Sequence, residues 1–153
     1  MKAGMKDVAR HAQVSVATVS HVINNTRFVS EETRKKVMDS IEALGYVPDP
    51  TARSFKTGRK NLIGIVVPDI SNPVWALIIE EAESVLAKDG YKLLIVNTKE
   101  TESREIENLK LLSSGLVDGL IIASTLTDFS CIRPLVPDQF PMVFIDRKLP
   151  GCP

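Results

Sequence analysis

The chain has 153 residues, of which 44% are hydrophobic and 25% are charged, the balance of a soluble globular protein with room for one domain and part of another. Its longest apolar runs, such as Leu62–Val67, are too short to cross a bilayer, and no signal peptide opens the chain, so we expect no membrane contact. Cys131 and Cys152 lack metal-ligand spacing, which argues against a metal site or a disulfide scaffold and favours a cytoplasmic location.

The formal net charge of zero hides an asymmetry along the chain. Residues 1–60 carry 11 Lys and Arg against 6 Asp and Glu, whereas residues 61–153 carry 8 against 13. A basic first part suggests contact with a polyanion. Chance clustering of solvated surface charge explains the asymmetry equally well.

The first 45 residues predict three short helices that share a small core. Lys6–Ala12 places Val8, Ala9 and Ala12 on one face, and Gln13-Val14 interrupts the pattern. Ser15 is a suitable N-cap for a second helix, Val16–Asn24, with Val19, Val22 and Ile23 turned inward. Ser30 caps a third, with Glu31 and Glu32 in its first turn, an apolar stripe of Val37, Ile41 and Leu44, and Gly45 at its end.

Residues 46–61 have the character of a hinge. Asp49-Pro50 is an N-cap followed by a first-turn proline, which predicts a short helix over Pro50–Lys56. A helix of about two turns is marginal in water on its own, so we expect this segment to need a partner in order to fold.

From Leu62 onward, strands alternate with helices. Short apolar runs typical of strands buried on both faces are Leu62–Val67, Leu93–Val96, Gly119–Ala123 and Met142–Ile145. Between them lie Pro73–Lys88, with Trp75, Ile78, Ile79, Ala82 and Val85 on one side, and Ser103–Ser113, ended by Gly115; Asp128–Val136 is a weaker helix. This alternation predicts a parallel sheet with right-handed crossovers.

The first two helices have the spacing of a helix-turn-helix, whose second helix lies in the major groove of DNA with its N-terminal residues at base edges. Those residues are Val16 and Ala17, with His21 one turn on. Valine and alanine offer apolar contact to a thymine methyl group, and histidine can donate to a purine N7. On this pattern alone, a small helical interaction domain remains an open alternative.

A longer series of motifs is more specific. It comprises Asp7–Asn24, Val29-Ser30, Thr33-Arg34, Gly45–Pro48, Ala52–Ser54, Pro68–Pro73, Val117–Gly119 and Phe144–Arg147. In this order the motifs resemble the lactose/galactose repressor (LacI/GalR) family across essentially the whole chain from Met5. The resemblance implies a DNA-binding transcriptional regulator, a repressor that binds a pseudo-palindromic operator as a homodimer.

The family's DNA contacts can be carried over by position. Base reading falls to Val16, Ala17 and His21, and contact with the DNA backbone to Ser15, Thr18, Ser20, Asn24 and Arg27. The hinge helices of two subunits would pair in the minor groove, using Ala52, Arg53, Phe55 and Lys56. Phe55 stands at the position of an apolar wedge that is mostly leucine in the family. Packing of Phe55 on the core is the alternative.

Two further implications concern backbone and length. Gln13 occupies a turn position often filled by glycine, which predicts modest strain if its backbone is left-handed. Family members continue for roughly another domain and a half, completing two subdomains around a sugar or nucleobase effector. Ser71, Asn72, Trp75 and Asp146 would form one wall of that cleft, although Asn72 serves equally well as a helix start and Asp146 as a loop acid. We therefore expect a lost or incomplete effector response in this chain.

The resulting fold class is α followed by α/β. We expect a three-helix helix-turn-helix headpiece over 1–47, a hinge helix and linker over 48–61, and over 62–153 an incomplete Rossmann-like parallel subdomain of the type I periplasmic-binding-protein kind. No phosphate loop, nucleophile elbow or metal spacing is present, which argues against an enzyme and against a cofactor. The alternative function is a shortened sugar-binding module without a DNA role.

Overall fold

The computed structural model describes residues 3–48, 54, 58–147 and 149–152, which fall into two compact units divided between residues 50 and 51. We call them the headpiece and the core. The predicted hinge residues Ala52, Arg53, Phe55 and Lys56 lie outside the described residues. Within the described residues no helix has the length and apolar character that a membrane crossing requires.

The headpiece contains α1 (Met5–His11), α2 (Val16–Asn24) and α3 (Glu31–Ala43). The second helix has its predicted bounds because Ser15 caps it, accepting the N–H of Thr18 at 3.0 Å. Ser30 caps α3 in the same way through Thr33. Buried apolar side chains from all three helices form one core, made of Val8, Ala9, Ala12, Val19, Val22 and Val37.

Each headpiece helix is followed by a residue with left-handed backbone. These residues are Gln13 (φ 55°), Asn25 (φ 51°) and Gly45 (φ 57°). After α1, the N–H of Val14 bonds the carbonyl of Ala9 at 3.0 Å, which is the long bond of a Schellman motif. The left-handed turn expected at Gln13 is thus present, at a residue whose Cβ disfavours it.

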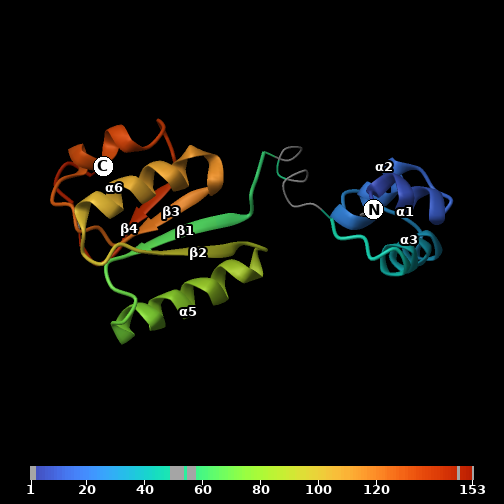
Figure 1. The fold of residues 1–153 in the computed structure, drawn as a ribbon, viewed down its shortest axis with the longest axis horizontal. Coiled ribbons are helices and arrows are strands. Elements are labelled where there is room, and N and C mark those ends of the chain that lie inside the picture. The colour runs from blue at the N-terminus through green and yellow to red at the C-terminus, as the bar shows by residue number, and fades with distance from the viewer. Residues whose placement is uncertain (1–2, 49–53, 55–57, 148, 153) are drawn as a thin grey trace. The chain divides into compact units, whose positions relative to one another are not determined.

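The core contains one parallel sheet with strand order β2-β1-β3-β4 (Figure 1). The strands are β1 (Leu62–Val67), β2 (Lys92–Asn97), β3 (Gly119–Ile122) and β4 (Met142–Phe144). The helical segments are α5 (Pro73–Lys88), α6 (Glu102–Leu111), η1 (Leu112–Leu116), α7 (Phe129–Ile132) and η2 (Arg133–Leu135). The predicted fold class, helical and then parallel α/β, is confirmed.

The two faces of the sheet are covered by different helices (Figure 1). Ile65 and Val67 of β1 pack with Trp75 of α5, whereas Val66 packs on the opposite face with Leu109 and Leu112. Gly64 also faces that second side, where a Cβ would come within 2.6 Å of Leu120. A larger residue at position 64 would therefore have to displace the Leu120 side chain of β3 and crowd Leu112 of η1.

Burial differs from the prediction at the sheet edges and on α5. The strands β2 and β4 are only partly buried, and Val85 of α5, expected to face inward, is exposed. Four strands about 4.8 Å apart form a sheet wider than one helix, whose diameter is about 10–12 Å. Helix α5 therefore cannot cover the whole of its face, and Ile95 and Val143 stay exposed at the outer strands.

The predicted helix Ser103–Ser113 is also altered at its end. Helix α6 stops at Leu111 and is followed by a kinked turn, in which the N–H of Val117 bonds the carbonyl of Leu112 at 3.2 Å. Gly115, with φ at 102°, is not helical and allows this kink. Beyond it, the Asp118 carboxylate accepts the backbone N–H groups of Lys60 and Asn61, which ties the segment before β1 to the segment before β3.

The left-handed turns generate a prediction about stability. Gln13→Gly should raise the free energy of unfolding of the headpiece by about 1 kcal/mol, because glycine removes the steric cost of positive φ. Gly45→Ala, the matched opposite change, should lower it by about 1 kcal/mol, since no atom within 4 Å would meet the new Cβ and only the backbone cost remains. Urea unfolding of the full chain, followed through the amide signals of Val8 and Val19, measures both. Shifts of the same sign in the two variants would contradict this account.

Candidate nucleic-acid interface

The middle of α2 is buried against the headpiece, and its first turn is exposed. Val19 and Val22 are 0% and 4% exposed, while Val16 is 42% exposed and Ala17 is exposed beside it. His21 is half-buried one turn further on. The three residues predicted to read bases therefore lie outside the hydrophobic interior of the headpiece. Val16 and Ala17 are accessible apolar side chains at the start of α2, and His21 is a polar side chain one turn further on.

The polar side chains predicted to contact the DNA backbone are largely engaged in local bonds. The Ser15 hydroxyl lies 2.8 Å from that of Thr18 in addition to capping the helix. The Asn24 amide donates to the Ser20 carbonyl at 2.9 Å, which leaves its own Oδ1 buried without a hydrogen-bond partner in the described part of the chain. Arg27, in the loop after α2, is exposed.

A hollow of about 950 Å³ adjoins the start of α2. It is lined by Val16 and by residues of α1 and the segment before it. Among these lining residues are Lys6, Arg10 and His11. Arg10 pairs with Asp7 at 3.3 Å but remains largely exposed. Cationic side chains thus flank the proposed base-reading surface, where a phosphate backbone would need them. The sequence reasoning did not select them, because only the packing of α1 beside α2 brings them to this surface.

The loop after α2 carries two further features that the sequence reasoning missed. Phe28 is 95% exposed, a large apolar side chain next to Arg27. Thr26 bonds the ring of His21, with 2.8 Å between Thr26 Oγ1 and His21 Nδ1. Asn25 was the available signal for the contact between Thr26 and His21. Asparagine after a helix tolerates a left-handed turn, and that turn brings the following residue back toward the last turn of the helix.

The residues predicted as an effector wall lie at the carboxyl edge of the core sheet. After β1, the Asp69 carboxylate accepts both the hydroxyl of Ser71 at 2.7 Å and its N–H at 3.0 Å, which lowers the pKa of Asp69 below its usual range. Asn72 caps α5 through the N–H of Val74 at 3.1 Å, so it is a helix start. Trp75 is only 7% exposed and packs in the hydrophobic interior against Ile65 and Val67 of β1.

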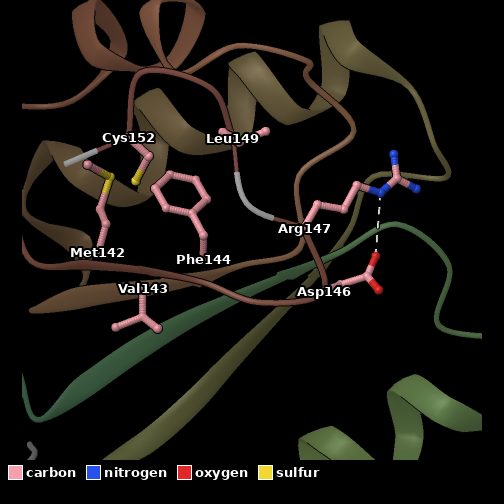
Figure 2. Close-up of a pocket in the computed structure, with 7 residues that line it drawn as sticks. All are labelled: Met142, Val143, Phe144, Asp146, Arg147, Leu149 and Cys152. Atoms are coloured by element: carbon pink, nitrogen blue, oxygen red, sulfur yellow. Dashed lines mark ion pairs between the residues drawn. The ribbon is translucent and has the colours of Figure 1, made fainter.

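Asp146 lies in the loop after β4, at the same carboxyl edge of the sheet. It pairs with Arg147, with 3.5 Å between Oδ2 and Nε, and its φ is 71°. Both residues line a hollow of about 480 Å³ together with Phe144, Met142 and Cys152 (Figure 2). Figure 2 shows Phe144 and Met142 on the side of the strand facing Leu149 and Cys152, with Val143 on the opposite side. Of the four predicted wall residues, only Asp146 reaches this hollow.

Beneath the same sheet edge lies a buried carboxylate, Glu105, with no exposed surface. One oxygen accepts the hydroxyl of Ser124, and the other accepts the N–H and the hydroxyl of Thr125 at 2.8 and 2.6 Å. These three donors satisfy the hydrogen-bonding capacity of the buried carboxylate. Among the described side chains no cation is bonded to it. Helical spacing was the missed signal, since Glu105 precedes buried Leu109 by one turn on α6.

Two family descriptions match the chain. Residues 4–49 match "Bacterial regulatory proteins, lacI family", and residues 60–153 match "Periplasmic binding proteins and sugar binding domain of LacI family". The chain belongs to the lacI family of bacterial regulatory proteins. The family predicted from the sequence motifs is thereby confirmed.

Individual lacI-family relatives agree. The chain is 41% identical to the HTH-type transcriptional regulator RegA of Clostridium acetobutylicum over 97% of its length and 44% of that protein. It is 38% identical to the ribose operon repressor of Bacillus subtilis over 99% of its length and 45% of that protein. A solved lacI-family regulator from Silicibacter pomeroyi matches 93% of this chain and 43% of its own, with 29% identity and a TM-score of 0.75. The chain thus spans less than half the length of these relatives, which are named as regulators and not as enzymes.

The Glu105 network predicts the effect of a single-atom change. Glu105→Gln should lower the free energy of unfolding of the core by about 1–3 kcal/mol, because an amide group would face the donors on Ser124 or Thr125. Glu107→Gln, the same change at an exposed position of α6, should alter it by less than about 0.5 kcal/mol. Urea unfolding followed by the fluorescence of Trp75, the single tryptophan, measures both. Equal values for the two variants would show that the buried hydrogen bonds contribute nothing specific.

Proposed function

We propose that this lacI-family chain is a sequence-specific DNA-binding regulator, acting as a repressor through the exposed side of α2. The observation that carries the proposal is the exposure of Val16 and Ala17 in the first turn of a helix that Val19 and Val22 fix in the headpiece interior. An α-helix fits the major groove with its N-terminal residues at the base edges. Apolar contact from Val16 and Ala17 suits thymine methyl groups, and His21 supplies the polar contact.

The charges of the headpiece support the same proposal. Lys6 and Arg10 lie beside Val16, and exposed Arg27 follows the helix. Sequence-independent affinity for DNA comes mainly from such cations at phosphates. Ser15, Thr18, Ser20 and Asn24 are proposed to add hydrogen bonds to the backbone, although each also has a local partner.

We propose that two copies bind one operator. Helix α5 presents an apolar stripe on its outer side, formed by Val74, Leu77 and Val85, each more than half exposed. Spacings of three and eleven residues from Val74 keep these side chains on one helical face. A stripe of this kind favours self-association of the core, which would bring two headpieces to a two-fold symmetric site.

For the core we propose that it supplies part of the contacts to a small polar effector of the sugar or nucleobase class, in keeping with the incomplete effector response expected from the sequence. The family description of residues 60–153 includes a sugar-binding domain, and the name of the ribose operon repressor includes a sugar. Asp146 and Arg147 form the polar part of the hollow at the sheet edge, where ligands of such folds bind. We propose no reaction and no cofactor for either unit.

Selection of bound sites from random DNA tests the DNA-binding proposal. The wild-type chain should select a pseudo-palindrome, and Val16→Thr with Ala17→Gln should change the preferred bases in each half, since glutamine pairs with adenine in the major groove. Each altered base pair should be worth about 1–3 kcal/mol. Met38→Gln, at an exposed position of α3, should leave the selected sequence unchanged. An unchanged sequence for the α2 variant as well would refute the assignment of the reading helix.

The proposed wedge at Phe55 gives a separate prediction. Phe55→Ala should weaken binding to the selected site by about tenfold or more and binding to random DNA by much less, because only the specific complex is bent by an inserted side chain. Phe55→Leu, which keeps an apolar wedge, should retain most of the specific affinity. Fluorescence anisotropy with both DNAs at one salt concentration gives the ratio. Equal losses on the two DNAs would reject the wedge role.

A further inference from the structure

The ring of His21 is held by a neighbouring hydroxyl before any DNA is bound. Thr26 Oγ1 lies 2.8 Å from Nδ1 of His21, and Nδ1 is the ring nitrogen nearer the backbone. The other ring nitrogen, Nε2, has no hydrogen-bond partner within the described part of the chain. The inference drawn from this contact rests on the proposed function, in which His21 meets a base edge.

Thr26 is itself fixed in place by the end of α2. Asn25 adopts φ of 51°, which turns the chain back so that the N–H of Thr26 bonds the carbonyl of His21 at 3.3 Å. Arg34 of α3 donates to the Asn25 side chain at 3.0 Å and secures that turn from a second helix. The hydroxyl therefore belongs to a defined cap and not to a freely moving loop.

We propose that Thr26 is a positioning residue that sets the hydrogen-bonding character of His21. In this proposal the Thr26 hydroxyl, which bonds no other acceptor among the described residues, donates to Nδ1, and a neutral imidazole whose Nδ1 accepts carries its proton on Nε2. Nε2 then presents an N–H to the DNA. A donor at this point matches the acceptors N7 and O6 of guanine, or N7 of adenine. With the proton on Nδ1 instead, Nε2 would be an acceptor and would match the amino group of cytosine or adenine.

The second histidine of the headpiece has the opposite arrangement. Nδ1 of His11 lies 3.0 Å from the Ser40 hydroxyl, and that hydroxyl donates its single proton to the carbonyl of Lys36 at 2.7 Å. Nδ1 of His11 must therefore be the donor, with the proton on Nδ1. The chain has only these two histidines, so each serves as an internal reference for the other.

Nitrogen NMR of the full chain tests the proton positions without DNA. At about pH 8.5, where histidine is ordinarily neutral, ¹⁵N shifts separate a protonated ring nitrogen from a bare one. We expect Nε2–H at His21 and Nδ1–H at His11, assigned with His11→Gln. Thr26→Val, which keeps the shape and removes the hydroxyl, should shift His21 toward a mixture, while Thr26→Ser should restore the wild-type shifts. Thr33→Val, the same change in a hydroxyl that bonds Ser30 instead, should leave His21 unaltered.

Site selection from random DNA supplies the second readout. Thr26→Val should reduce the preference at one base position in each half-site by a factor of about 3 to 10, the worth of one hydrogen bond, and Thr26→Ser should keep it. Nδ1–H at wild-type His21, or a Thr26→Val variant with unchanged shifts and unchanged base preference, would overturn the proposal. If no variant and no wild-type chain selects any DNA, the proposed function fails, and the nitrogen shifts still decide whether Thr26 sets the tautomer.

Discussion

The burial of Val19 and Val22 against α1 and α3 determines what the headpiece can contact. Burying a valine side chain stabilises the folded state by about 1.5–3 kcal/mol, which is large for a unit with few core residues. Because these two side chains fix the rotation of α2, Ala17 faces outward, and Val16 stays partly exposed because it lies in the first turn, three residues before Val19. The proposed recognition surface is therefore a consequence of core packing, and a change at Val19 would disturb DNA contact without touching DNA.

The same logic separates structural from available polar groups. Ser15, Asn24, Ser71 and Asn72 were all predicted to contact DNA or a ligand, and each makes a local hydrogen bond within four residues. Such residues shape the surface around a site. Arg27 and Phe28 are instead exposed, and Asp146 and Arg147 line an open hollow. These are the groups whose energetics would change most when a partner arrives.

Local signals predicted local structure well. Ser15 and Ser30 predicted the starts of α2 and α3, and Gly45 predicted the end of α3. The strand β1 has its predicted bounds. Features that depend on neighbours in space were predicted poorly. The exposure of Ile95 and Val143 follows from the width of the sheet relative to one helix, and no periodicity in the sequence reports that width. The kinked turn after Leu111 depends on packing of Leu112 under the sheet as well as on Gly115.

The candidate site shows the same division. The spacing within Val16–Asn24 predicts Val16, Ala17 and His21 as base-reading residues, and the family motifs predict the remaining contacts. Thr26 was not predicted from the sequence, because its proposed effect on His21 depends on a hydrogen bond across a left-handed turn that Arg34 secures. The burial of Glu105 was not predicted from the sequence, because a carboxylate on a helix is ordinarily solvent-exposed. Only the hydrogen-bond donors on Ser124 and Thr125 compensate for its burial.

The central claim is that the headpiece meets the phosphates and bases of DNA, and the salt dependence of binding tests it most directly. For the selected site, the logarithm of the affinity should fall linearly with the logarithm of the salt concentration, with a slope that reports the number of phosphate contacts. Arg27→Gln should reduce the size of that slope by about 1, whereas Arg133→Gln in the core, where the arginine pairs with Asp138, should leave it unchanged. Affinity that does not respond to salt, or identical slopes for wild type and Arg27→Gln, would contradict the account.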